Sequence, residues 1–245
     1  RAIEAPLDPR CVVDEDVIDM VADYLAQSLE AARTSDGEFA LKLRRYGASR
    51  TAITNAVRKR VGGRRHQIVH DWRSLVDAVL PAIGVGVEAE VEDLARREKT
   101  SALEQLACGR FSVLIGPAGS GKTTLLRVLC DLPEINSGGI LLLAPTGKAR
   151  VRLEEATERL GEGMTLAQFL QRYERYDGTS GRYFRNPDAP REKGFRSVIV
   201  DECSMLTEDQ LAALIDAIEG VDRLILVGDP RQLPPIGAGR PFVDI

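Results

Sequence analysis

The segment GPAGSGKTT, Gly116 to Thr124, constrains the fold of this chain more than any other feature. It follows the apolar run FSVLIG and precedes an apolar segment with helical spacing, which predicts a tight turn between a buried strand and a helix. Glycines let backbone N–H groups turn toward phosphate oxygens, and a helix N-terminus adds positive potential. The segment therefore predicts a phosphate-binding loop; the alternative is a strand-to-helix turn around no ligand.

Two side chains of this loop have specific predicted tasks. Lys122 is expected to reach the β- and γ-phosphates of a nucleotide, and the Thr123 hydroxyl is expected to bind Mg²⁺. The other loop residues are expected to surround the phosphates mainly with backbone groups: Gly116, Pro117, Ala118, Gly119, Ser120, Gly121 and Thr124.

From Phe111 onward, apolar runs alternate with helical patterns. The four runs FSVLIG, GGILLLA, RSVIVDE and RLILVGD are near-continuous Val, Leu and Ile, which is typical of strands buried on both faces. Helices are expected from about Lys122 to Cys130, after Thr146, and from Thr207 to Glu219. The predicted fold class is α/β, a P-loop domain with a parallel sheet covered by helices.

The first part of the chain has no comparable series of strands. We expect residues 1–87 to form a smaller, mainly helical domain and residues 88–245 to form the α/β domain. An acid-rich helix from Glu88 to about Cys108 leads into the first strand. Two stretches with helical spacing and one candidate hinge precede it: Val12 to Ala32, Leu75 to Leu80, and Ile83 to Val87.

Polar residues follow two further strands at the sheet edge where α/β proteins bind ligands. Asp201 is expected to hold Mg²⁺, and Glu202 to orient and deprotonate the attacking water. Taken alone, such an acid pair is more often a solvated turn, but behind a phosphate loop it predicts hydrolysis. The Gln232 amide can hydrogen-bond a γ-phosphate and lose that bond on hydrolysis. Lys122, Asp201, Glu202 and Gln232 form the predicted catalytic set.

The segment LLLAPTGKARVRL places polar and basic groups where a strand gives way to a helix. Thr146, Lys148, Arg150 and Arg152 suit the backbone phosphates of a nucleic-acid strand. The alternative is a helix with a solvated basic face. The net charge of −4 does not exclude nucleic acid, because residues 39–70 hold nine basic residues and no acidic one.

That basic segment has the spacing of a helix-turn-helix. Leu43, Gly47 and Ile53 match the pattern, and Ser49 is a candidate cap for a second helix that carries Arg58, Lys59 and Arg60. Contact with duplex DNA is one interpretation, and a helical packing domain with a solvated basic face is the other.

Two smaller patterns also suggest ligands. His66 and His70 in HQIVH are one helical turn apart, but no third metal ligand is evident. Between Tyr173 and Phe184 an aromatic and basic stretch predicts a hairpin. Its aromatic rings either stack on bases, or separate strands, or pack locally.

In order and spacing, GPAGSGKTT, APTGKAR, DECSM and GDPRQLPPIGAG resemble motifs I, Ia, II and III of RecD-like superfamily 1 DNA helicases, over roughly residues 98–239. The resemblance implies a RecA-like first motor domain that binds ATP and single-stranded DNA, in a branch that moves 5′ to 3′. It also implies that the GDPRQ strand lies between the strands bearing Lys122 and Asp201. It assigns the same tasks to Lys122, Thr123, Asp201, Glu202 and Gln232 as given above.

This sequence departs from the family pattern in three places. The family's adenine-contacting Gln falls at Lys99, and the nearest candidate, Gln105, is only 17 residues before Lys122. TLAQFL resembles the strand-binding motif TIHxLL, which predicts DNA contact by Thr165, but Ala167 replaces its His. The family's second motor domain supplies arginines to the ATP site, and this sequence ends just after motif III. We therefore expect this fragment to bind ATP and hardly hydrolyse it.

The expected function is part of an ATP-dependent DNA helicase that couples ATP hydrolysis to translocation on single-stranded DNA and to duplex unwinding. ATP, Mg²⁺, single-stranded DNA and a duplex junction are the expected ligands. One alternative is a switch or loader ATPase that acts on nucleic acid without unwinding it; another is a helix-turn-helix module with a degenerate P-loop. No apolar run approaches the roughly 20 residues of a membrane span, and four cysteines without a CxxC pair favour the reduced cytoplasm.

Overall fold

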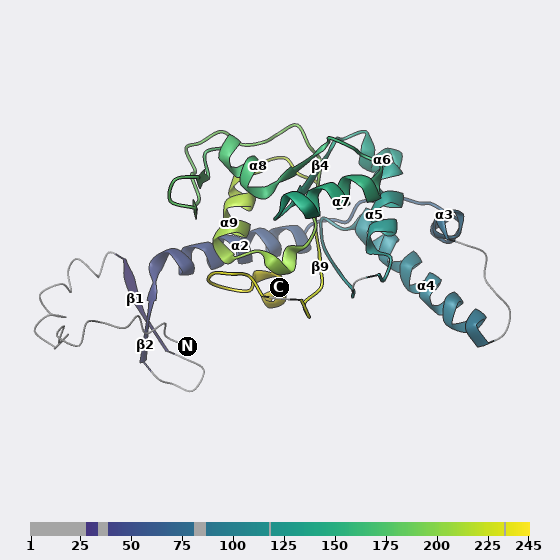
Figure 1. Cartoon of the computed structure of the whole chain (residues 1–245), viewed down its shortest axis with the longest axis horizontal. Coiled ribbons are helices and arrows are strands. Elements are labelled where there is room, and N and C mark those ends of the chain that lie inside the picture. The colour runs from purple at the N-terminus through teal and green to yellow at the C-terminus, as the bar shows by residue number, and fades with distance from the viewer. Residues whose placement is uncertain (1–27, 34–38, 81–86, 118, 233) are drawn as a thin grey trace, which may run out of the picture. The chain divides into compact units, whose positions relative to one another are not determined.

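The computed structural model describes residues 28–33, 39–80, 87–117, 119–232 and 234–245. The chain separates into two compact units, Arg1–Ala48 and Ser49–Ile245. In the first unit, β1 (Leu29–Arg33) and β2 (Phe39–Leu43) form an antiparallel ladder (Figure 1). The predicted helical stretch is wrong for residues 28–32, which form a turn and most of β1, because pairing along the strand overrides a weak local preference. Residues 12–27 of that stretch and nearly all of the predicted hinge lie outside the described residues.

The predicted helix-turn-helix is not formed, because α2 (Arg44–Val61) is one uninterrupted helix. A single interior glycine such as Gly47 costs a helix only about 1 kcal/mol, which packing can offset. Ser49 does not cap a second helix. Its hydroxyl donates a hydrogen bond to Asp209 at 3.0 Å, and Ile53 is buried in the core. Contacts with residues far along the sequence therefore keep this helix continuous.

The second unit is built on a five-stranded parallel sheet in the order β3-β9-β8-β4-β5 (Figure 1). The predicted α/β fold class and all four predicted strands are confirmed, and β9 lies between β3 and β8 as the family resemblance implied. The fifth strand was missed because it has only three residues. The strands are β3 (Phe111–Ile115), β9 (Arg223–Gly228), β8 (Ser197–Val200), β4 (Ile140–Ala144) and β5 (Gly163–Thr165).

Helices cover both faces of this sheet, and most of the predicted ones are confirmed to within a few residues. They are α3 (Trp72–Val79), α4 (Val87–Cys108), α5 (Lys122–Asp131), α6 (Pro133–Asn136), α7 (Gly147–Thr157), α8 (Leu166–Arg172), α9 (Glu208–Ala217) and α10 (Pro241–Asp244). A 3₁₀ turn, η1 (Cys203–Met205), and a hairpin of β6 (Tyr176–Asp177) and β7 (Arg182–Tyr183) complete the unit.

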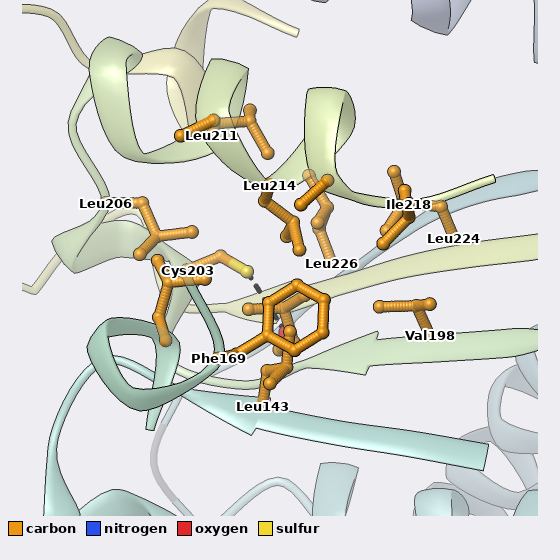
Figure 2. Packing of buried hydrophobic residues seen from close by; sticks show 14 of the residues in the cluster. Leu143, Phe169, Val198, Cys203, Leu206, Leu211, Leu214, Ile218, Leu224 and Leu226 are labelled. Carbon is orange, nitrogen blue, oxygen red and sulfur yellow. Dashed lines mark hydrogen bonds between the residues drawn. The ribbon is translucent and has the colours of Figure 1, made fainter. Parts of the chain in front are cut away.

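The two faces of the sheet form two hydrophobic clusters, because successive strand residues point to opposite sides. On one side, Leu143 and Val198 pack with Phe169 of α8 and Leu214 of α9 (Figure 2). On the other side, strand residues that include Ile199 pack with α4, α5 and α7.

Helix α3 belongs to the same packing as the sheet. Val76 is buried in the second cluster, with residues of α4 and α5. The compact unit that contains the sheet therefore begins at Ser49, earlier than the domain boundary predicted at residue 87. No helix in the described part of the chain has the length and apolar character to cross a bilayer.

The two histidines of HQIVH lie in an irregular segment, not on one helical turn. His66 Nε2 is 3.2 Å from the backbone carbonyl of Asp222, and His70 Nε2 is 3.1 Å from the Glu134 carboxylate. Within the described ranges, no three His, Cys, Asp or Glu residues are grouped so as to hold a metal ion.

Candidate functional site

One edge of the sheet collects every predicted site segment. All five strands are parallel, so their carboxyl ends meet at this edge, where open α/β sheets bind ligands. Each strand is followed by predicted residues: Gly116 to Thr124 after β3, Gln232 after β9, Asp201 and Glu202 after β8, Thr146 and Lys148 after β4, and Thr165 at the end of β5. The order of the strands places the Gln232 segment between the phosphate loop and the acid pair.

The phosphate loop favours glycine for two different reasons. At Gly116 an added Cβ would lie 2.6 Å from the Ser120 hydroxyl oxygen, so the Ser120 side chain would have to move. Gly119 and Gly121 have φ values of +78° and +85°, a region that other residues rarely adopt. The Gly116 N–H also donates to the Gly228 carbonyl at 3.3 Å, which ties the loop to the end of β9.

The donors around this loop fit a phosphate group. Helix α5 begins at Lys122 and has no side-chain cap on its N-terminus, so its first N–H groups and the helix dipole suit an anion. The Lys122 ammonium donates to the carbonyls of Gly116 at 2.5 Å and Pro117 at 2.9 Å. Thr123 follows, half-buried in the first turn.

The acid pair is held in a strained and partly desolvated position. Glu202 has φ +53°, which is uncommon for a residue other than glycine and is typical of functional sites. Its N–H donates to the Asp201 carboxylate at 2.8 Å. Burial raises the pKa of Asp201, and the charge of Glu202 raises it further. The hydrogen bond from the Glu202 N–H and the positive charge of Lys122 lower it.

A cavity of about 940 Å³ opens among the loops that follow β4, β8 and β9. Three segments line it: Pro145 and Thr146 after β4, Met205 with the start of α9, and the loop after β9 that contains Gln232. Met205 and Ile236 are exposed apolar residues on its walls. Neither residue was predicted, because they become neighbours only where these loops meet in the fold. The available signal was that both lie within the segments that resemble motifs II and III.

The five residues predicted to bind nucleic acid differ in their surroundings. Thr146 lines the cavity and also caps α7, accepting a hydrogen bond from the Ala149 N–H at 3.2 Å. Lys148 is exposed. Arg150 pairs with the buried Glu154 at 2.9 Å, and Thr165 forms a capping box at the start of α8. Arg152 is exposed, and of the five residues only Thr146 lines the cavity.

The predicted hairpin is confirmed, and most of its aromatic rings pack locally. Tyr176 and Tyr183 stack with ring centroids 4.5 Å apart, and Tyr173 packs on Phe169 at 4.9 Å. Phe184, by contrast, is 40% exposed. The aromatic residue of this hairpin that is accessible to another molecule is therefore Phe184.

A glycine-rich loop at a helix N-terminus, facing an acid pair on a nearby parallel strand, defines a P-loop nucleotide-binding domain. Residues 95–245 match the family model of the AAA domain, and the chain belongs to this family.

Known relatives agree with the resemblance predicted from the four motifs. The chain is 37% identical over 171 residues to the ATP-dependent RecD2 DNA helicase of Deinococcus radiodurans, covering 68% of this chain and 22% of that protein. It is 30% identical over 196 residues to the RecBCD enzyme subunit RecD of Mycolicibacterium smegmatis, covering 71% and 35%. An uncharacterized protein of Methanocaldococcus jannaschii, MJ1519, is 32% identical over 168 residues, covering 65% and 14%. The resemblance to RecD-like helicases is confirmed, and the chain spans between 14% and 35% of the length of these relatives.

Among solved structures, Bacteroides Pif1 bound to ssDNA is similar at 23% identity and a TM-score of 0.37. The similarity covers 57% of this chain and 33% of that chain.

Proposed function

We propose that this chain is the ATP-binding motor domain of a RecD-like, ATP-dependent DNA helicase that moves on single-stranded DNA and unwinds duplexes. The observation that carries the proposal is the position of Gln232. Its loop follows the strand between the phosphate loop and the acid pair, and Gln232 also lines the cavity next to Thr146. The Gln232 segment is thus in a position to contact the bound nucleotide and to change the contacts with a DNA strand.

The nucleotide would bind through the donors of the phosphate loop. Lys122 would exchange its carbonyl partners for phosphate oxygens, while the N–H groups at the start of α5 bind the same anion. Thr123 and Asp201 offer the hydroxyl and carboxylate oxygens that Mg²⁺ prefers, and both are half-buried. When bound, Mg²⁺ would neutralise phosphate charge and relieve the desolvated Asp201 carboxylate.

Hydrolysis would depend on two side chains of this edge. Glu202 would accept a proton from the attacking water, and its left-handed backbone fixes the direction of the carboxylate. The Gln232 amide would donate to the γ-phosphate and lose this bond after cleavage. Arginines of a second motor domain would stabilise the transition state, so the present 245 residues would bind ATP with little turnover.

Single-stranded DNA would lie along the other part of the edge. The apolar walls of the cavity suit the faces of bases, and the Thr146 hydroxyl and the Lys148 ammonium suit backbone phosphates. Thr165 would contact the strand further along. Phe184 on the hairpin would meet the duplex junction.

The described cysteines Cys108, Cys130 and Cys203 are free and buried, which supports a place in the reduced cytoplasm.

Coupling between the two sites is the property to test. The affinity of the chain for a fluorescent oligo-dT should change several-fold between the nucleotide-free form and the form bound to a Mg²⁺-ATP analogue. Gln232→Ala should keep nucleotide binding and remove this difference. Gln67→Ala, a matched substitution of an exposed glutamine that does not line the cavity, is the control. Equal DNA affinity with and without nucleotide in the unsubstituted chain would contradict the proposal.

Unwinding separates a helicase from a switch or loader ATPase. The longer protein that contains this chain should unwind a 5′-tailed duplex in an ATP-dependent reaction and should not unwind a 3′-tailed one. ATP hydrolysis with no unwinding of either substrate would favour the switch or loader.

A further inference from the structure

A second pocket, which we call the arginine pocket, runs along β3, the outermost strand on one side of the sheet. Its volume is about 360 Å³, within the range of small-ligand sites. The ends of α2 and α4 and the strand itself form it, and all of them belong to one compact unit. Arg60, Arg65 and Arg110 line the pocket, and no acidic residue of the described chain does. Because Arg110 directly precedes β3, the basic groups lie at the end of this strand opposite the phosphate loop.

The three guanidinium groups have little negative charge around them. Arg110 Nη2 is 3.8 Å from the Asp222 carboxylate, whose other oxygen accepts from Arg196 Nε at 3.0 Å. The carboxyl-terminal ends of α2 and α4 together supply the equivalent of about one negative charge. At least about one positive charge of the pocket therefore stays without compensation in the described structure.

Arg60 is the least satisfied of the three arginines. Its Nη1 donates to the Ala56 carbonyl at 3.2 Å, but its Nε is buried and has no hydrogen-bond partner among the described residues. Burial and the positive charge of Arg110 both lower the pKa of Arg60. Buried donors of native proteins are nearly always paired, and an exception requires an explanation such as a bound ion. An anion in the pocket would compensate this charge.

The backbone of β3 adds donors to the pocket. In the described chain no strand pairs with the outer side of β3. Arg110 accepts from the Leu224 N–H at 3.0 Å, and the Gly116 N–H donates to the last residue of β9 at 3.3 Å. Even-numbered residues thus bond to β9, and alternate residues of a parallel strand bond to opposite sides. The N–H groups of Phe111 and Val113, which line the pocket, therefore point away from β9.

The positive charge extends beyond the pocket. Arg58, Lys59 and Arg64 are exposed and adjoin lining residues in the sequence, and residues 39–70 hold nine basic residues and no acidic one. A free phosphate ion would use the pocket alone, whereas a nucleic-acid backbone presents a row of phosphates that can meet several separate cations. The distribution of charge therefore favours a nucleic acid.

We propose that the arginine pocket is a nucleic-acid-binding site that holds one backbone phosphate, separate from the cavity that contains Gln232. The guanidinium groups and the outward N–H groups of β3 bind this phosphate, and the exposed cations of the 58–64 segment contact its neighbours. The proposal goes beyond the proposed function, because this site depends neither on the nucleotide nor on the ligand-binding edge.

The test measures the affinity of the complete chain for a fluorescent, blunt-ended DNA duplex, without nucleotide and at several salt concentrations. A blunt duplex has no single-stranded end for the cavity. The triple variant Arg60→Gln/Arg65→Gln/Arg110→Gln should bind this duplex at least about tenfold more weakly at low salt. The slope of log affinity against log salt should become shallower by about one, because one phosphate contact is lost.

Two further variants separate a specific site from general charge and from folding. Arg97→Gln/Arg191→Gln/Lys193→Gln removes the same charge from exposed positions outside the pocket, and should leave the salt slope unchanged. Arg60→Met should weaken duplex binding without lowering the thermal unfolding temperature of the free chain, because the buried guanidinium is poorly compensated.

Three results would overturn the proposal. The first is equal duplex affinity and salt slope in the pocket variant and the unsubstituted chain. The second is the same loss in the control variant, which would mean general attraction to basic residues. The third is competition by poly-glutamate at the affinity of the duplex, which would assign the pocket to an acidic protein.

The failure of this inference is distinguishable from that of the proposed function. The pocket variant should keep the nucleotide-dependent change in oligo-dT affinity, since Gln232 and the phosphate loop are unaltered. Loss of that change in the pocket variant would contradict the separation of the two sites. Its absence in the unsubstituted chain would overturn the proposed function and leave this inference to the duplex measurement.

Discussion

The two halves of the ligand-binding edge use their motif residues differently. After β3, β9 and β8, the functional groups do little for the fold: Lys122 donates only to carbonyls of its own loop, and Asp201 is desolvated beside a second carboxylate. After β4 and β5, the predicted groups also build the fold: Thr146 and Thr165 cap helices, and Arg150 pairs with Glu154. In the proposed nucleotide half, the groups that would bind the ligand should therefore lower stability. In the other half, substitutions should change stability and binding together.

The largest effect on stability is expected for Glu154, which joins Arg150 to the first residue of β5. Glu154 is 5% exposed and accepts from both Arg150 and the Gly163 N–H, the latter at 2.8 Å. Glu154→Ala leaves that N–H and the guanidinium without their partner, and should lower the free energy of unfolding by about 3 kcal/mol. Chemical denaturation measures this. The exposed neighbour Glu155 provides the control, Glu155→Ala, with a change within about 0.5 kcal/mol. Similar changes in the free energy of unfolding for the two variants would contradict the proposed difference between the two halves of the edge.

A substitution in the acid pair should raise the free energy of unfolding, which is the opposite of the change expected for Glu154→Ala. Burial and the charge of Glu202 raise the pKa of Asp201, so folding favours the protonated carboxyl. Its contribution to stability is full at low pH and is lost as pH rises through the raised pKa. Asp201→Asn should therefore increase the free energy of unfolding by about 0.5–2 kcal/mol at pH 7, while abolishing Mg²⁺-dependent nucleotide binding. The gain should disappear near pH 3. A destabilised variant at pH 7 would contradict the interpretation of this site.

A smaller loss is expected from the helix caps. Thr165→Ala removes the acceptor for the Gln168 N–H at 3.2 Å and should cost about 1 kcal/mol, whereas Thr165→Ser should cost little. If Thr165 also contacts DNA, the Ser variant should keep its affinity for single-stranded DNA, because the hydroxyl remains. Loss of stability in the Ala variant with unchanged DNA affinity would assign this threonine to the fold alone.

The parts of the fold that were predictable have strong local signals. The four long strands are near-continuous runs of Val, Leu and Ile, and the phosphate loop carries its own turn and helix signals. The place of β9 between β3 and β8 came from the family resemblance. The Arg150–Glu154 pair was missed, because Arg150 was assigned to nucleic acid, although residues four apart on a helix are neighbours.

The errors lie where distant contacts decide the structure. Helix α2 stays continuous through Gly47 because Ser49 bonds to Asp209, 160 residues away. β5 has too few residues to show a strand-like alternation in the sequence, and it is defined by its pairing with β4. The cavity that Met205 and Ile236 line forms from three segments, so the sequence of any one segment does not predict them as lining residues.

Nucleotide binding by the phosphate loop is the claim on which both halves depend, and direct titration tests it. A Mg²⁺-ATP analogue should bind the chain with micromolar or tighter affinity. Lys122→Ala should reduce that affinity at least about a hundredfold with an unchanged thermal unfolding temperature, since Lys122 bonds only to its own loop. Lys59→Ala should bind like the unsubstituted chain. Equal affinity of the Lys122→Ala variant and the unsubstituted chain would contradict the assignment of this loop as the nucleotide site.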